Sequence, residues 1–216
     1  MDAVEKTIKE YNRIAESYAL ENDSEDVFDV MKPLLDRFKS HTGYDKIILD
    51  AGCGHGRDAW YLTQSAYDVV GIDLSDRILD IARKRAPRAE FFKMDMRNLL
   101  FSADIFDGIW ACASFLHIPK QESYDVLSQF YRVLKSDGVL FLCVKEGDSE
   151  GFVSSKSYGG CERYFSYYSL YELEKLLNNS GFEIFEAVKT KSFINTYSRV
   201  KKTNDSETIP FISQVI

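Results

Sequence analysis

Residues 47–58 read Ile-Ile-Leu-Asp-Ala-Gly-Cys-Gly-His-Gly-Arg-Asp. An apolar run passes into alternating glycines, and an amphipathic pattern follows at residues 57–64. Glycines at such a position let the backbone approach a ligand closely, and open α/β sheets bind their ligands at the carboxyl ends of the strands. The stretch therefore predicts a strand, a ligand-binding loop and a helix, in that order.

The segments around this stretch alternate between short apolar runs and amphipathic patterns. The apolar runs predict strands at residues 46–50, 69–73, 90–94, 105–110, 139–144 and 182–188, with a seventh at about 193–201. Helical spacing appears at residues 4–20, 26–39, 57–64, 75–85, 120–134 and 170–179. This order predicts the α/β class, with a doubly wound, mostly parallel seven-stranded sheet and N-terminal helices.

The length of 216 residues favours one domain. We expect that domain to cover residues 1–202 and to include an N-terminal helical cap over about residues 1–42. Residues 203–216 carry no clear period and are expected to form a C-terminal tail.

Composition and charge exclude several classes of protein. The chain holds 27 Lys and Arg against 34 Asp and Glu, which gives a net charge of −7. This charge disfavours a nucleic-acid partner, because proteins that follow a phosphate backbone usually carry a basic stripe. Its four cysteines are far apart and match neither zinc spacing nor a disulfide scaffold, as in a reduced cytoplasmic protein. No apolar run is long enough to span a bilayer, and the first residues lack a signal-peptide pattern. We expect a cytoplasmic protein without a membrane segment.

Two kinds of nucleotide ligand compete for the glycine loop. The dinucleotide fingerprint G-x-G-x-x-G fails when it is counted from Gly52, because its third glycine falls on Arg57. Counted from Gly54 it ends on Ala59, which the relaxed form of the fingerprint allows. A phosphate-binding loop of the type G-x-x-x-x-G-K-[ST] is absent from the sequence. The glycines alone therefore do not decide between the ligands.

Two charged residues beside the glycines narrow the choice. Asp50 would repel a pyrophosphate but attract a ligand that carries an ammonium or sulfonium group. Arg57 could meet a ligand carboxylate with a bidentate pair of hydrogen bonds. Together they predict a ligand with a zwitterionic amino-acid end, against the alternative of a tight turn with a surface arginine.

Acidic residues also end the second and third predicted strands. Asp73 lies 17 residues beyond Gly56, close to the separation at which an acid accepts ribose hydroxyls of an adenosyl or a nicotinamide cofactor. Asp95 could accept from an adenine amino group while Leu74 and Met96 sandwich the ring. An ordinary turn at the end of the strand is the alternative for Asp95.

These motifs together resemble the class I S-adenosylmethionine-dependent methyltransferases. The stretches Phe-Asp-Gly-Ile at 106–109 and Leu-Lys-Ser-Asp-Gly-Val-Leu at 134–140 are similar to later motifs of that family, and the resemblance covers about residues 8–188. Residues 57–58 and 110–113 are similar to small-molecule members of the tellurite-resistance type. The resemblance implies a Rossmann-like methyltransferase fold with S-adenosylmethionine as the cofactor.

The resemblance also implies a set of cofactor contacts. They come from the glycine loop, from the acids at the strand ends and from one residue after the fourth strand: Gly52, Cys53, Gly54, Asp73, Asp95, Met96 and Ala111. Tyr11 and Tyr18 fall where N-terminal helices of such enzymes cover the cofactor. For both tyrosines, packing within a helical core is an equally good explanation.

The sulfonium methyl of this cofactor is already activated, so its transfer depends more on alignment than on a covalent intermediate. A general base is required only when the acceptor arrives protonated. His117, after the fourth predicted strand, is the candidate for that base, and a structural histidine is the alternative. The aromatic-rich residues 158–171 could wall an acceptor pocket or pack in the core.

We therefore expect an enzyme that transfers a methyl group from S-adenosylmethionine to a small molecule and releases S-adenosylhomocysteine. No bound metal is expected. Three alternatives stay open: a non-catalytic S-adenosylmethionine-binding module, a nicotinamide-dependent oxidoreductase and a tRNA methyltransferase. Asp50 disfavours the oxidoreductase, and the net charge of −7 disfavours the tRNA enzyme.

Overall fold

The computed structural model describes residues 2–201. Its helices are α1 (Ala3–Asn22), α2 (Glu25–Thr42), α3 (Arg57–Thr63), α4 (Asp76–Arg85), α5 (Ser123–Val133) and α6 (Leu170–Asn179), with short 3-10 turns η1 (Phe115–His117), η2 (Lys120–Glu122) and η3 (Lys156–Tyr158). Its strands are β1 (Ile47–Ala51), β2 (Asp68–Asp73), β3 (Glu90–Lys93), β4 (Phe106–Cys112), β5 (Leu134–Lys145), β6 (Glu150–Ser155), β7 (Cys161–Ser166), β8 (Phe182–Thr190) and β9 (Phe193–Val200).

Seven of the strands form one sheet in the order β3-β2-β1-β4-β5-β9-β8. The strands from β3 to β5 pair in parallel, and β9 runs antiparallel to both of its neighbours. The predicted mostly parallel, seven-stranded sheet is therefore confirmed, including its seventh strand. The chain winds outward from β1 in both directions, so a crevice opens at the carboxyl ends of β1 and β4.

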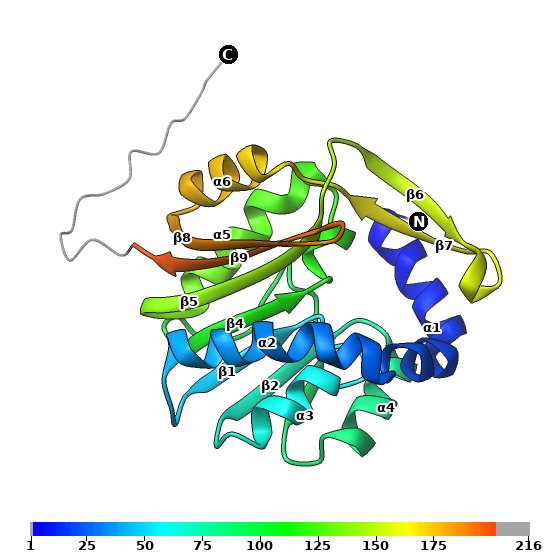
Figure 1. Ribbon diagram of the computed structural model, residues 1–216, viewed down its shortest axis with the longest axis horizontal. Helices are drawn as coiled ribbons and strands as arrows, with labels where there is room; N and C mark the ends of the chain where they lie inside the picture. The colour runs from blue at the N-terminus through cyan, green and yellow to red at the C-terminus, as the bar shows by residue number, and fades with distance from the viewer. Residues whose placement is uncertain (1, 202–216) are drawn as a thin grey trace.

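Helices cover both faces of this sheet (Figure 1). One buried cluster joins α2, α3 and α4 to the sheet, with fully buried side chains such as Leu35, Phe38, Leu62 and Leu79. A second cluster joins α5 and α6 to the opposite face through residues such as Phe130, Leu173 and Leu177. Burial of both faces explains why the central strands are nearly continuous apolar runs in the sequence.

The two N-terminal helices differ from the single cap that the sequence predicted. α2 packs directly on the sheet, where the rings of Phe38 and Trp110 lie 5.3 Å apart in an edge-to-face contact. Only α1 stands away from the sheet, against the end of α4 and the strand β7 (Figure 1). The cap is therefore α1, and α2 belongs to the helical layer.

A two-stranded antiparallel hairpin, β6–β7, occupies a segment for which no strand was predicted. Its turn contains Gly159 and Gly160, which have φ values of +60° and +76°. Paired glycines favour such hairpin turns because they adopt positive φ without steric cost. The hairpin holds α1 through an ion pair between Lys6 and Glu162 at 2.8 Å and through the Tyr164 amide, which donates to the Thr7 hydroxyl at 3.0 Å.

Among residues 2–201, no helix has both the length and the apolar character needed to cross a membrane. The tail predicted at residues 203–216 lies outside the described part of the chain.

Candidate functional site

The glycine loop after β1 is a sharp bend in which three glycines have positive φ: +76° at Gly52, +53° at Gly54 and +81° at Gly56. A Cβ atom at Gly52 would lie 2.3 Å from the Cβ of Ser114, and one at Gly56 would lie 2.9 Å from the Cα of Ala82. Side chains at these positions would therefore overlap neighbouring elements. The bend brings bare backbone to the carboxyl end of the sheet.

Asp73, at the end of β2, stabilises this bend through hydrogen bonds. One of its carboxylate oxygens accepts a hydrogen bond from the Gly54 amide at 3.1 Å, and the other accepts from the Ser75 amide at 2.9 Å. Burial raises the pKa of Asp73, and these amide donors oppose that rise. The carboxylate keeps further lone pairs for a ligand hydroxyl.

A first cavity opens beside Asp73, over the ends of β1, β2 and β3 and under α1. It brings together most of the predicted site residues: Tyr11, Tyr18, Gly52, Gly54, Asp73, Leu74, Asp95, Met96 and His117. Its wall also contains apolar side chains such as Ile72, Ile78 and Met94. An apolar cavity with a few convergent polar groups is the usual form of a small-molecule site.

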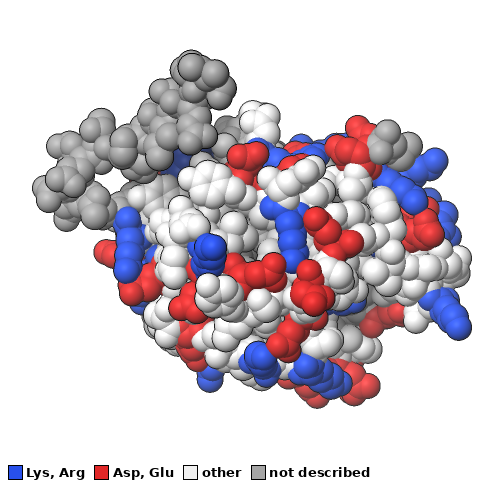
Figure 2. Space-filling model, turned by 90° about the horizontal axis from the view of Figure 1, so that it is seen from above, with Lys and Arg blue, Asp and Glu red and all other residues white. Residues whose placement is uncertain are grey.

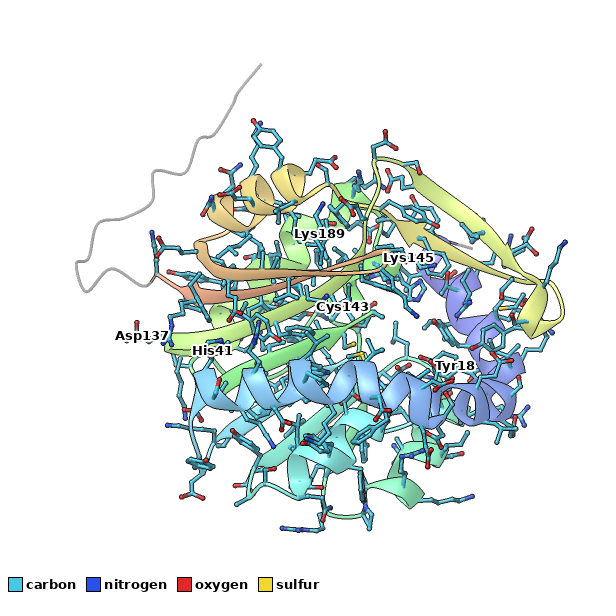
Figure 3. All side chains as sticks on the ribbon, in the orientation of Figure 1. Tyr18, His41, Asp137, Cys143, Lys145 and Lys189 are labelled. Atoms are coloured by element: carbon cyan, nitrogen blue, oxygen red, sulfur yellow. The ribbon has the colours of Figure 1, made fainter. Side chains whose placement is uncertain are left out.

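A second cavity adjoins the first and shares Tyr18, Gly52 and Gly54 with it. It contains three further predicted residues: Asp50, Cys53 and Arg57. Its other walls come from the apolar side of α2 and from the ends of β4, β5 and β9. In Figure 3, Tyr18 lies across an opening from Cys143 and Lys145 of β5.

Asp50 lies on the floor of the second cavity and is 2% exposed. Its Oδ2 atom has no hydrogen-bond partner within residues 2–201. Burial and the nearby Asp58 carboxylate raise the pKa of Asp50. A buried acceptor of this kind is stabilised most by a donor or cation that a ligand supplies.

Arg57 forms hydrogen bonds within the protein that the sequence did not predict. Its Nε donates to Asp58 at 2.7 Å, and its Nη1 donates to the carbonyl of Asn22 at 3.3 Å. Asp58 in turn accepts from the indole of Trp110 at 2.9 Å. Arg57 borders the second cavity, but two of its three nitrogens are already engaged, so its predicted fork to a ligand carboxylate is limited.

Asp95 is similarly engaged. Its carboxylate receives two hydrogen bonds from Arg97 Nε, at 3.0 and 3.1 Å, and one from Arg97 Nη2 at 2.7 Å. Arg97 also pairs with Glu122 at 2.8 Å. An adenine amino group at Asp95 would have to share the carboxylate with this arginine.

Ala111 requires a correction. It is fully buried within β4, opposite Leu142 of β5, and it borders neither cavity. Because β4 continues through Cys112, the chain first borders the cavities at Cys112 and Ala113, and both residues line both of them. Cys53 lies at the second cavity, 7% exposed, and burial raises the pKa of its thiol.

His117 has both ring nitrogens occupied. Its Nδ1 lies 2.5 Å from the carbonyl oxygen of Tyr164, which can only accept, so Nδ1 carries a proton. Burial lowers the pKa of His117 to about 3, so the ring is neutral and Nε2 accepts from the Tyr11 hydroxyl at 2.8 Å. Arg163 completes the chain by donating to the Tyr11 oxygen at 3.1 Å. This geometry favours the structural alternative over a general base.

Besides Cys112 and Ala113, sequence reasoning missed three polar residues at or beside the site. Ser114 donates to the carbonyl of Ala51 at 2.5 Å and closes over Gly52. Its place two residues after the end of β4 was the available signal. Arg163 and Lys145 adjoin the His117 network. Arg163 was missed because it lies on β7, a strand that the sequence did not predict. Among the described residues, no group of three or more His, Cys, Asp or Glu side chains is arranged to hold a metal ion.

Comparison with known proteins relates this chain to methyltransferases. Residues 48–138 match the family described as a methyltransferase domain. Methyltransferase GfsG of Streptomyces halstedii is 34% identical over 100 residues, which cover 43% of this chain and 35% of that protein. A malonyl-[acyl-carrier protein] O-methyltransferase of Salmonella typhimurium is 32% identical over 93 residues, covering 43% of this chain and 36% of its own. The chain thus spans about a third of the length of these curated relatives.

Solved structures extend the likeness to the whole fold. The 1,6-didemethyltoxoflavin-N1-methyltransferase of Burkholderia thailandensis, solved with S-adenosylhomocysteine, has a TM-score of 0.73 at 20% identity and covers 94% of this chain and 92% of its own. A TehB-like methyltransferase of Corynebacterium glutamicum has a TM-score of 0.63 at 20% identity and covers 87% and 98% of the two chains. At this identity the likeness concerns the fold, so the tellurite-resistance subgroup stays a prediction.

Fold and motifs together define a Rossmann-like methyltransferase domain. Residues 48–138 form a methyltransferase domain of the class I S-adenosylmethionine-dependent type, as the motifs predicted.

Proposed function

We propose that this protein transfers the methyl group of S-adenosylmethionine to a small-molecule acceptor and releases S-adenosylhomocysteine. The observation that carries the proposal is the first cavity. There the backbone bend at Gly52, the Asp73 carboxylate and the apolar pair Leu74 and Met96 lie together under α1. These groups match the methionine, ribose and adenine portions of one ligand.

The residues present fit this cofactor. Leu74 and Met96 would enclose the adenine ring, and Asp73 would accept from the ribose hydroxyls. The unpartnered Oδ2 of Asp50 would receive a donor from the methionine end, beside the junction of the two cavities. When bound, the cofactor supplies an activated methyl group.

The protein's contribution to the reaction is then alignment and exclusion of water. Tyr11 and Tyr18 of α1 line the first cavity, and their rings meet edge to face at 5.2 Å. Tyr18 also lies over Gly54, within 3.9 Å of the position that a Cβ there would occupy. Fixing donor and acceptor in a near-attack geometry can supply about 7–11 kcal/mol of the barrier.

The same observations bear on two of the alternatives. The Asp50 carboxyl beneath the bend is unfavourable for the pyrophosphate of a nicotinamide cofactor. Figure 2 shows basic and acidic side chains interleaved over the upper face, whereas nucleic-acid-binding proteins gather basic side chains into a patch or stripe. This supports a small acceptor over tRNA.

Calorimetric titration with S-adenosylmethionine, S-adenosylhomocysteine and NAD tests the choice of cofactor. We expect both adenosyl ligands to bind and NAD to bind far more weakly, and a preference for NAD would overturn the proposal. A radiolabelled-methyl screen of cell extract, divided into small-molecule, RNA and protein fractions, tests the acceptor. Label is expected in the small-molecule fraction, whereas no label in any fraction would favour a non-catalytic binding module.

A further inference from the structure

Two cationic side chains meet the same aromatic ring beside the first cavity. The guanidinium carbon of Arg163, on β7, lies 5.5 Å from the centroid of the Phe165 ring, and Lys145 Nζ, at the end of β5, lies 4.2 Å from it. The ring of His117, which lines the first cavity, also contacts Phe165 with centroids 4.7 Å apart. Phe165 therefore links the two cations to the first cavity through His117, although neither cation itself lines that cavity.

Neither cation has a carboxylate partner within residues 2–201. Arg163 is only 9% exposed, and its Nε makes no hydrogen bond to the described part of the chain. Its guanidinium donates to the Tyr11 hydroxyl and stacks on the rings of Tyr11 and Tyr158 at 5.2 and 5.0 Å. Lys145 likewise contacts aromatic rings, those of Phe165 and Tyr167. These contacts hold the cations in place without neutralising them.

Acidic residues stand next to both cations in the sequence, yet each pairs elsewhere. Glu146 pairs with Lys189 at 2.5 Å, and Glu162 pairs with Lys6 at 2.8 Å. The carboxylates nearest to the two cations in the sequence therefore form ion pairs with other lysines.

The lack of a carboxylate partner is costly for Arg163, because a buried cation is normally paired with an acid, whereas Lys145 is only partly buried. Arg57, which is also largely buried, illustrates the usual solution, since Asp58 lies 2.7 Å from its Nε. Burial and the charge of Arg163 lower the pKa of Lys145, so the two cations act against each other. An anion bound beside both would relieve this repulsion.

We propose that Arg163 and Lys145 bind an oxyanion group of the methyl acceptor, so that the acceptor is a small carboxylate or phospho-type anion. The inference rests on the proposed function, because it assigns the cation pair to the acceptor of that reaction. Figure 3 places Lys145 at the opening that faces Tyr18, where an acceptor would approach the cofactor. The surrounding aromatic rings would then contact the apolar part of the acceptor.

Titration of the S-adenosylhomocysteine-saturated protein with benzoate, phenylphosphonate and the neutral analogue benzamide tests this site. We expect at least one anion to bind about tenfold or more tightly than benzamide, because charge-assisted hydrogen bonds are the strong ones. The two anions distinguish a carboxylate acceptor from a phospho-type acceptor. Lys145→Gln and Arg163→Gln are each expected to weaken anion binding by about tenfold.

Lys135→Gln is the matched control, because Lys135 lies at the other end of β5 and pairs with Asp107 at 2.8 Å. It is expected to leave anion binding unchanged. Equal binding of benzamide and the anions, binding of neither anion, or an equal loss in the control would overturn the inference. If Arg163→Gln does not fold by circular dichroism, Lys145→Gln decides. Failure to bind S-adenosylhomocysteine refutes the proposed function instead, and anion titration of the ligand-free protein then still tests the cation pair.

Discussion

At the scale of single residues, Asp73 connects the fold to the site. Its two oxygens accept from the amides of Gly54 and Ser75, so the same carboxylate that would hold a ribose also fixes the bend after β1. A strand-end acid could be predicted from the sequence because parallel strands end on one edge of a sheet. Its hold on the bend could not, because that depends on the conformation of a neighbouring loop.

Replacing Asp73 with Ala is expected to weaken S-adenosylhomocysteine binding by about 1–3 kcal/mol, because a buried hydrogen-bonded group is lost. Calorimetry measures the affinity directly. Asp76→Ala is the control, since Asp76 forms an exposed pair with Lys93 at 2.6 Å on the adjacent helix. Unchanged affinity in Asp73→Ala would contradict the ribose role.

The buried His117 ring should make the stability of the protein depend on pH. Its pKa is lowered to about 3 in the native protein, against a usual value near 6.5. Between these values the unfolded chain binds a proton that the native chain does not, so stability falls as pH falls through this window, by up to about 1.4 kcal/mol per pH unit. Denaturant unfolding at several pH values should show this slope, reduced in His117→Asn. A ring that titrates near pH 6.5 by NMR would refute it.

At the scale of elements, the sequence predicted all seven strands of the main sheet, including the partly exposed β3 and β8, and missed both strands of the hairpin. β1 and β4 are almost wholly buried, and each is an apolar run in the sequence. The residues of β6 are all exposed or only partly buried, so the strand carries no apolar alternation to recognise. The site positions on the main sheet therefore followed from the pattern, whereas Arg163 on the hairpin did not.

The bend after β1 depends on glycine for two reasons that can be separated. At Gly52 a side chain would meet both the positive φ and the Ser114 side chain, whereas at Gly159, with φ +60°, nothing lies within 4 Å of an added Cβ. Gly159→Ala should therefore cost about 1–2 kcal/mol of unfolding free energy from backbone strain alone. Gly52→Ala should cost more and should also abolish measurable S-adenosylhomocysteine binding. Equal losses of stability in the two variants would contradict the role of the Ser114 contact.

At the scale of the molecule, the cavities lie between parts that are distant in sequence: α1, the loops after β1, β2 and β4, and the start of β9. A ligand that fills them joins these parts and should stabilise the whole fold. The side-chain pairs that shape the cavities, such as Arg57 with Asp58 and Arg97 with Asp95, could not be predicted as pairs, because their pairing depends on how the side chains pack.

S-adenosylhomocysteine at a hundred times its dissociation constant should raise the free energy of unfolding by about 2.7 kcal/mol. For a chain of this size, that corresponds to an increase in melting temperature of about 5–10 °C. Scanning calorimetry with and without the ligand measures the shift, with NAD at the same concentration as the control. An equal shift with NAD would argue against the proposed cofactor.

The contact between α1 and the hairpin has a kinetic consequence. Tyr11 of α1, the helix that would cover the cofactor, accepts a hydrogen bond from Arg163 of the hairpin that would bind the acceptor. A bound acceptor would hold α1 in place over the cofactor. The cofactor could then exchange only after the methylated product has dissociated. Steady-state inhibition patterns should accordingly be those of a compulsory sequence, in which the nucleoside enters first and leaves last.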